Sequence, residues 1–119
     1  MTGYVTNIEN DTIANEDYRR VLYTGEFTQL VLMTLAPGVE IGLETHAGHD
    51  QFIRIERGTG QALIGGETHQ VKDGTAFVIP AGAEHNVVNT SSDEPLRLYT
   101  LYSPPEHPDR LVQPTKADE

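Results

Sequence analysis

Two segments of the chain carry side chains whose types and spacing could bind a metal ion or move a proton. The first, residues 38–51, contains Glu44, His46 and Gln51. In an extended backbone Glu44 and His46 are two residues apart and point to the same face. If the loop at residues 47–48 turns the chain back, Gln51 on the next strand faces the same space. A carboxylate, an imidazole and an amide oxygen would then converge on one point.

The second segment, residues 74–89, places a histidine at the start of a strand. An apolar run ends at the turn sequence Pro80-Ala81-Gly82, and the next run begins with His85. Glu84 precedes it directly, and at the mouth of a pocket this carboxylate could act as a general base. The alternative is that Glu84 is only a loop carboxylate.

The other histidines have less specific settings. His49 lies three residues after His46, so it is either an alternative ligand or, as we favour, a loop residue at the mouth of the site. His69 falls in a predicted hairpin strand and His107 in a proline-rich tail, and both are assigned ordinary surface roles. The candidate catalytic residues are therefore Glu44, Glu84 and His49.

The elements that must position these side chains are short β-strands. Apolar and alternating runs are separated by turn residues at short, even spacing from Leu30 to Tyr102. This pattern is typical of an all-β sandwich or small barrel. A single helical turn is expected near residues 15–18. The predicted strands are residues 29–35, 51–56, 61–64, 68–71, 76–79, 85–89 and 96–102.

The alternation of residues 51–56 gives Gln51 an unusual position. It shares one face with Ile53 and Ile55, whereas Phe52 and the charged residues after it lie on the other face. An amide that faces an apolar interior needs polar partners. A metal ion, a water molecule or a substrate would supply them.

Composition excludes several classes of function. The 119 residues include 8 Lys and Arg against 18 Asp and Glu, a net charge of −10, and no Cys. This charge argues against nucleic acid or an anionic membrane as partner, because both are bound through clusters of Lys and Arg. Without Cys, a site must use nitrogen and oxygen ligands. No apolar run suits a membrane span, and the polar start is not typical of a secretory signal, so we expect a cytoplasmic protein.

The two segments resemble the two sequence motifs of small single-domain cupins, a superfamily that includes RmlC-like and mannose-6-phosphate isomerase-like proteins. In the first motif, which follows Gly38, the two histidine positions hold Glu44 and His46, and the acidic position holds Gln51. The second motif, Gly-x5-Pro-x-Gly-x2-His-x3-Asn, is matched throughout, at Gly74, Pro80, Gly82, His85 and Asn89.

The resemblance implies one domain over residues 1–119 with the fold of a double-stranded β-helix, the cupin jelly-roll barrel. The barrel core would span about residues 28–103. An N-terminal arm, residues 1–27, would include a strand segment, and residues 104–119 would form an irregular tail that is frayed at its end. The resemblance also implies a homodimer, in which the segment at residues 18–23 is a candidate for exchange between subunits.

The resemblance further implies a mononuclear divalent metal ion, Fe, Mn, Ni or Zn, bound by Glu44, His46, Gln51 and His85. Two imidazoles and one carboxylate are the ligands of many Fe(II) sites with open positions. We therefore expect a metal-dependent isomerase, lyase or dioxygenase that acts on a small polar or sugar-like molecule by isomerisation, ring opening or Fe-dependent oxygen chemistry. The alternatives are a non-catalytic cupin that binds or senses a small ligand, and a barrel whose site has decayed.

Overall fold

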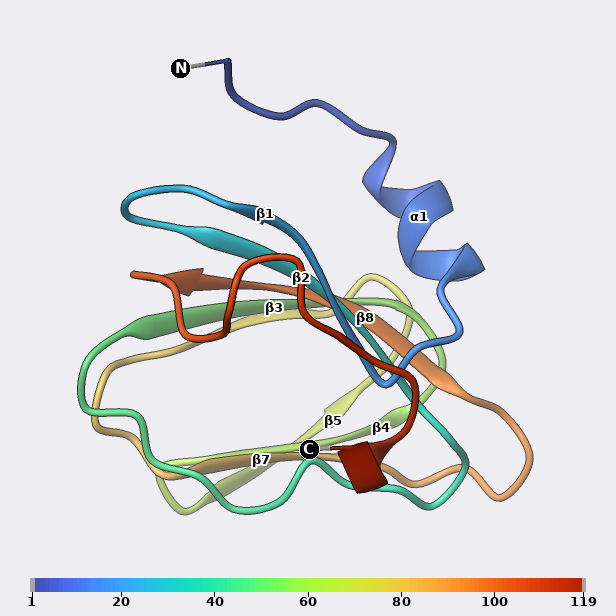
Figure 1. Ribbon diagram of the computed structural model, residues 1–119. Coiled ribbons are helices and arrows are strands. Elements are labelled where there is room, and N and C mark those ends of the chain that lie inside the picture. The colour runs from blue at the N-terminus through green and yellow to red at the C-terminus, as the bar shows by residue number, and fades with distance from the viewer. Residues whose placement is uncertain (1, 119) are drawn as a thin grey trace.

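The protein folds into two facing antiparallel sheets (Figure 1), described for residues 2–118 by a computed structural model. The larger sheet has the order β6-β3-β8-β2-β1-β9 and the smaller sheet the order β5-β4-β7. The strands are β1 (Arg19–Thr24), β2 (Gln29–Leu35), β3 (Asp50–Arg57), β4 (Gly60–Ile64), β5 (Glu67–Val71), β6 (Ala76–Ile79), β7 (His85–Asn89), β8 (Leu96–Ser103) and β9 (Val112–Gln113). The prediction of an all-β jelly roll is confirmed, and strands β2 to β8 match the seven predicted runs to within a residue or two at each end.

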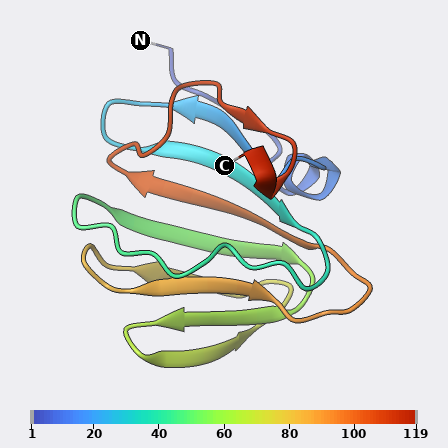
Figure 2. The same cartoon turned by 60° about the horizontal axis from the view of Figure 1, so that its bottom comes forward.

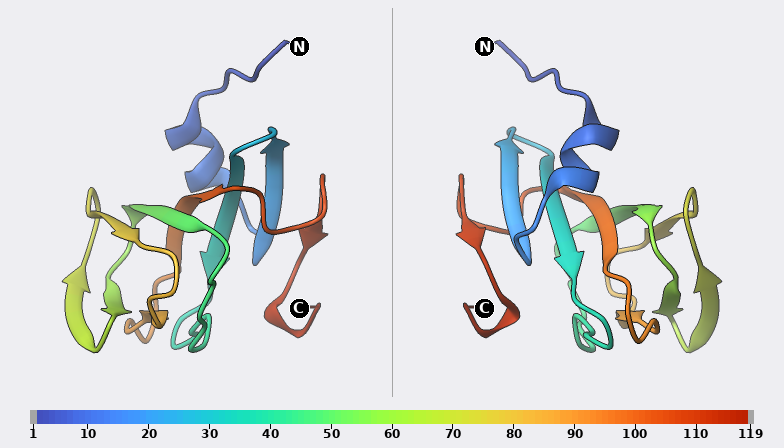
Figure 3. Two further views of the ribbon diagram at one scale, coloured as in Figure 1. Left: turned by 90° about the vertical axis from the view of Figure 1, so that its left-hand side faces the viewer. Right: turned by 90° about the vertical axis from the view of Figure 1, so that its right-hand side faces the viewer.

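The predicted position of the helix is wrong. Helix α1 (Ile8–Ala14) begins after Asn7, whose side chain accepts a hydrogen bond from the backbone N–H of Asn10. At the predicted position, the Asn15 side chain instead accepts from the backbone N–H of Asp17, which favours a turn over a helix. Figure 3 shows α1 on the outer side of the larger sheet, where it contacts β8, β3 and β2. Within residues 2–118, no helix has both the length and the apolar character needed to cross a membrane.

The hydrophobic core lies between the two sheets and follows the alternation of the strands. In β3, Ile53 and Ile55 are buried, whereas Phe52 and Arg54 on the other face are partly exposed. Each fully buried aliphatic side chain stabilises the fold by roughly 1.5–3 kcal/mol relative to its exposed state. The larger sheet also buries Val31, Met33, Leu35, Leu96 and Leu98, and the smaller sheet buries Ala62 and Val87.

Residues 39–44 extend the smaller sheet along the free side of β7. The Ile41 N–H donates to the carbonyl of Val87 at 2.9 Å. Further along, the backbones of Glu44 and His85 exchange two hydrogen bonds, each 2.9 Å long. This pairing sets the two residues directly opposite each other, although 41 positions separate them in the sequence.

The C-terminal tail runs beside β1, as Figure 2 shows. The N–H groups of Tyr18 and Val21 donate to the carbonyls of Pro114 and Leu111. A single 3₁₀ turn (Lys116–Asp118) ends the described part of the chain. The fraying expected at the chain end concerns residue 119, which lies outside the described residues. Strand β1 is the strand expected in the N-terminal arm, and it pairs with β2 of its own chain; its exchange in a homodimer stays a prediction.

One fully buried side chain attaches the tail to the larger sheet. Gln29 on β2 is 0% exposed, and its Nε2 donates to the His107 carbonyl at 2.7 Å. Its Oε1 accepts from the N–H groups of Glu106 and His107, at 3.2 and 3.0 Å. Residues 106 and 107 are thus held against the barrel.

Gly60, the first residue of β4, allows close packing of the smaller sheet. A Cβ atom at this position would lie 2.3 Å from the carbonyl oxygen of Val88 and 3.2 Å from Leu96. The first contact is with backbone and the second with a buried core side chain, so neither atom can shift easily to make room for the methyl group.

We predict that Gly60→Ala lowers the free energy of unfolding by about 1–3 kcal/mol, because the methyl group forces β4 and β7 apart. Urea denaturation would measure the loss. Gly48→Ala is the matched control, since no atom lies within 4 Å of a Cβ there, and it should change stability by less than about 0.5 kcal/mol. Equal effects of the two substitutions would contradict this account of the packing.

Candidate metal centre

The four predicted ligands lie around one small cavity between the two sheets. Glu44, His46, Gln51 and His85 all line it. The remaining wall consists of three aliphatic side chains and one tyrosine, namely Ile41, Ile53, Val87 and Tyr102. The structure therefore brings together the residues that the sequence motifs indicated.

Glu44 and His46 reach the cavity from the segment that extends the smaller sheet. The Nε2 of His46 lies 2.8 Å from Oε2 of Glu44, and both side chains are only partly exposed. This separation is close to the ~3 Å expected between adjacent ligand atoms that each lie about 2.1 Å from one metal ion. The ring centroid of His46 is 5.2 Å from that of His85.

The imidazole of His85 is held in one orientation by the backbone. Its Nδ1 lies 2.9 Å from the carbonyl oxygen of Ala83. A carbonyl only accepts hydrogen bonds, so Nδ1 must carry the proton. The lone pair of the neutral ring is then on Nε2, as in most histidines that bind metal.

Gln51 is the clearest sign that the cavity takes a ligand. The side chain is 4% exposed, and its Nε2 donates to Oγ1 of Thr100 at 3.0 Å. Its Oε1 is buried and has no hydrogen-bond partner. A buried polar atom in this state costs roughly 1–3 kcal/mol. An ion in the cavity would supply the missing partner, and the set of two imidazoles, a carboxylate and an amide oxygen suits Fe, Mn, Ni or Zn.

A second group of possible ligands lies beside the first and shares His46 with it. The Nδ1 of His49 is 3.1 Å from Oε2 of Glu106, and the His49 ring centroid is 4.5 Å from that of His46. One ligand atom from each of His46, His49 and Glu106 lies within 4.8 Å of the others. His49 precedes β3 in a loop, as predicted, but the residue is only 7% exposed and its Nε2 is buried without a partner.

The other histidines divide between the surface and the site. His69 is exposed on β5, in agreement with its predicted surface role. The surface role predicted for His107 is wrong, because its ring packs edge-on against Tyr102 at 5.1 Å and its Nε2 is buried. Glu84, a candidate base, is exposed and does not line the cavity.

The residues that sequence analysis missed come from the tail and from β8. Glu106 contacts His49, and Tyr102 lies between the rings of His49 and His107. Burial raises the pKa of Tyr102, so its phenol stays protonated near neutral pH. Burial, followed by the charge of His46, lowers the pKa of His49. The only signal in the sequence is a polar pair, Glu106-His107, among the prolines of the tail.

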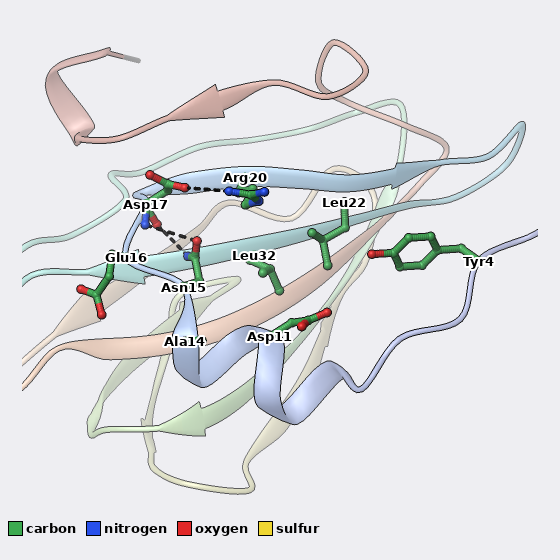
Figure 4. Close-up of a pocket in the computed structure, with 9 residues that line it drawn as sticks. All are labelled: Tyr4, Asp11, Ala14, Asn15, Glu16, Asp17, Arg20, Leu22 and Leu32. Atoms are coloured by element: carbon green, nitrogen blue, oxygen red, sulfur yellow. Dashed lines mark hydrogen bonds and ion pairs between the residues drawn. The ribbon is translucent and has the colours of Figure 1, made fainter.

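A separate hollow lies between α1 and the outer face of β1 and β2 (Figure 4). Its wall includes Asp11, Asp17 and Arg20, of which the last two form an ion pair of 3.5 Å. None of the predicted ligands lines this hollow. The hollow is therefore separate from the predicted metal site.

The sequence profile of the cupin domain family matches residues 31–102. This range contains both motifs and all four predicted ligands. The chain belongs to the cupin family. Strands β2 to β8 form the matched region, whereas α1, β1 and the tail lie outside it.

This cupin has close relatives in bacteria and in a virus. An uncharacterized Bacillus subtilis protein, YrkC, is 46% identical over 97% of the chain, and the chain spans only 64% of that relative's length. An uncharacterized protein, L612, of Acanthamoeba polyphaga mimivirus is 46% identical, with coverage of 88% of this chain and 68% of that protein. The crystal structure of the BH2720 protein of Bacillus halodurans is similar, with a TM-score of 0.95, 43% identity, and coverage of 98% of this chain and 92% of that one.

The environment of His107 predicts a loss of stability in acid. Burial, followed by the charges of Arg19, His46 and His49, lowers the pKa of His107 from 6.5 to about 4. Well above pH 6.5 the ring is neutral in both the folded and the unfolded state, so its titration does not change the free energy of unfolding. As the pH falls from 6.5 to 4, the unfolded chain gains a proton that the folded cupin does not accept.

We predict that His107 accounts for a loss of roughly 1–2 kcal/mol between pH 7 and pH 4.5, less than the full shift implies because solvent screens the ring in part. Urea denaturation at the two pH values would measure this loss. The free energy of unfolding should fall less for His107→Gln than for the parent. His69→Gln, at an exposed histidine, should leave the fall unchanged. An equal fall in all three proteins would contradict the assignment.

Proposed function

We propose that this cupin binds one divalent metal ion through Glu44, His46, Gln51 and His85 and uses it to act on a small polar or sugar-like molecule. The observation that carries the proposal is the buried Oε1 of Gln51, which has no partner although it belongs to a cavity wall with three other ligand groups. The tautomer of His85 adds support, because its backbone contact leaves Nε2 available as a ligand.

The second group of possible ligands, His46, His49 and Glu106, accounts for fewer of these observations than the four cavity residues do. In this group Nδ1 of His49 already pairs with the Glu106 carboxylate, although Nε2 of His49 is buried without a partner, and Glu106 is the most exposed of the three side chains. It also leaves the oxygen of Gln51 without a partner. We therefore place the ion among the first four residues and give the His49–Glu106 pair the task of holding a proton next to it.

A divalent ion in this cavity would act as a Lewis acid toward a carbonyl or hydroxyl oxygen. Thr100 orients the amide of Gln51, and the Ala83 carbonyl orients His85, so two ligands are fixed before anything binds. The Glu106 carboxylate pairs with the His49 ring, whose centroid lies 4.5 Å from that of the His46 ring. This arrangement suits isomerisation, ring opening or, with Fe, oxygen chemistry.

We predict that the protein, purified without an affinity tag, binds one equivalent of metal and that Glu44→Ala and His85→Ala reduce the metal content to near zero. Elemental analysis would measure it. Glu67→Ala and His69→Ala, at exposed positions on β5, are the matched controls and should keep full occupancy. Gln51→Glu should bind metal about tenfold more tightly or better, because a carboxylate replaces a neutral oxygen.

Glu106→Ala distinguishes the two groups of ligands. We expect this variant to retain its metal. Loss of metal from Glu106→Ala, with retention in Glu44→Ala, would place the ion at His46, His49 and Glu106 instead. Metal binding would be refuted altogether by two results together. The purified protein would contain no stoichiometric metal, and added metal would raise the thermal stability of the parent no more than that of Glu44→Ala and His85→Ala.

A non-catalytic cupin that binds or senses a small ligand is the competing proposal. The small size of the cavity favours it, because it leaves little room for a reacting molecule. Sugars, uronates and diketones, tested in turn with Fe, Mn, Ni and Zn, would separate the two functions. We predict product formation that is lost in His85→Ala; thermal stabilisation by a compound that yields no product would favour the binder.

A further inference from the structure

A third imidazole lies beside the metal cavity. His49 falls between the motif positions His46 and Gln51, and its side chain is 5% exposed. The ring packs against His46, at 4.5 Å between centroids, and edge-on against Tyr102, at 5.2 Å. Both of these neighbours line the cavity. The ring of His49 is therefore held against the residues that form the cavity wall.

Glu106 fixes which nitrogen of His49 carries the proton. Nδ1 lies 3.1 Å from Oε2 of Glu106, and a carboxylate accepts hydrogen bonds, so Nδ1 is the donor. In the neutral ring the lone pair is then on Nε2. Histidines that bind metal commonly donate from their other ring nitrogen to a carboxylate or a backbone carbonyl in this way. His49 thus has the arrangement that a backbone carbonyl gives to His85.

The lone pair of His49 has no partner in the protein. Nε2 is buried and makes no hydrogen bond. A buried acceptor in this state costs free energy that a bound ligand would restore. Gln51 is in the same condition, since its Oε1 is also buried without a partner. Both atoms accept rather than donate, so a single metal ion would satisfy both at once.

The separations of the three rings match those of imidazoles that share one ion. A ring bound through Nε2 at about 2.1 Å has its centroid roughly 3.2 Å from the ion. The centroids of two such rings then lie roughly 4.5 Å apart at an angle of about 90° around the ion, and roughly 5.2 Å apart at about 109°. The observed separations are 4.5 Å between His46 and His49 and 5.2 Å between His46 and His85. The spacing of His49 from His46 is therefore as suitable for a shared ion as that of His85.

We propose that Nε2 of His49 is a fifth protein ligand of the ion in the cavity, and that Glu106 is the residue that positions it. The proposal rests on the proposed function, since it concerns the same ion. The proton that the His49–Glu106 pair holds stays on Nδ1. Four protein ligands leave an octahedral ion two open positions, whereas five leave one. One open position suits Lewis-acid action on a single carbonyl or hydroxyl oxygen of the bound molecule, and it disfavours oxygen chemistry that needs two.

The test loads the protein with cobalt(II) and identifies the histidines that bind it. In the proton NMR spectrum, each histidine bound through Nε2 gives a strongly shifted signal from its Nδ1 proton, and this signal disappears in deuterated water. We expect one such signal of the parent to be absent from His49→Gln while cobalt stays bound. Every signal should remain in His69→Gln, the matched control at an exposed position on β5. Competition with a chelating dye should show that His49→Gln binds cobalt about tenfold more weakly or less.

Variants of Glu106 test the same ligand without replacing His49. Glu106→Ala removes the acceptor of the Nδ1 proton, so the His49 signal should broaden through exchange with water. The cobalt affinity should fall about tenfold, with the ion still bound at saturating cobalt. Glu106→Gln keeps an acceptor oxygen and should retain the signal and most of the affinity. A purely structural role of Glu106 predicts no change in the signal.

The possible failures can be told apart. Cobalt binding with the parent's full set of shifted signals and an unchanged affinity in His49→Gln would overturn the fifth ligand and leave the four-residue centre intact. Equal spectra and affinities of Glu106→Ala and the parent would overturn the positioning role of Glu106. Failure of the parent to bind cobalt would instead refute the proposed function, and the fifth ligand with it.

Discussion

The backbone pairing of Glu44 with His85 is the contact on which the rest of the site depends. Two hydrogen bonds of 2.9 Å join residues from two distant parts of the chain. Because side chains on directly opposed residues of an antiparallel pair lie on the same face, the carboxylate and the imidazole enter the same space. His46 follows two residues after Glu44, so the strand period brings its ring to that face as well.

Several polar groups inside the barrel have a structural reason that can be named. Thr100, 0% exposed, orients the amide of Gln51, and Gln29, also 0% exposed, binds the tail. Asn89 donates to three backbone carbonyls at the far end of β7, those of Leu35, Ala36 and Glu94. Three buried atoms near the site lack a hydrogen-bond partner, namely Oε1 of Gln51 and the Nε2 atoms of His49 and His107, and Gln51 is the one of these residues that lines the cavity.

The strands and the cavity residues could be predicted from the sequence because both depend on local rules. Alternation over residues 51–56 placed Gln51 inward, and the motif containing Pro80 and Gly82 placed His85 at the start of a strand. The positions of Glu106 and His107 follow instead from hydrogen bonds to Gln29, which lies 77 and 78 residues earlier in the chain. No local periodicity reports such a contact. The position predicted for the helix is wrong for a related reason, since the Asn15 side chain forms a turn and contacts Thr34 on β2.

The position of the tail has a consequence for the order in which the site is completed. Gln29 binds backbone at residues 106 and 107, and β1 closes on β9 at residues 112 and 113. During synthesis, the strands up to β8 emerge before these residues exist. The four cavity residues can therefore come together on a nascent chain before the tail reaches its place, which needs residues 106–113. Docking of the tail against Gln29 and β1 is therefore the later of the two steps.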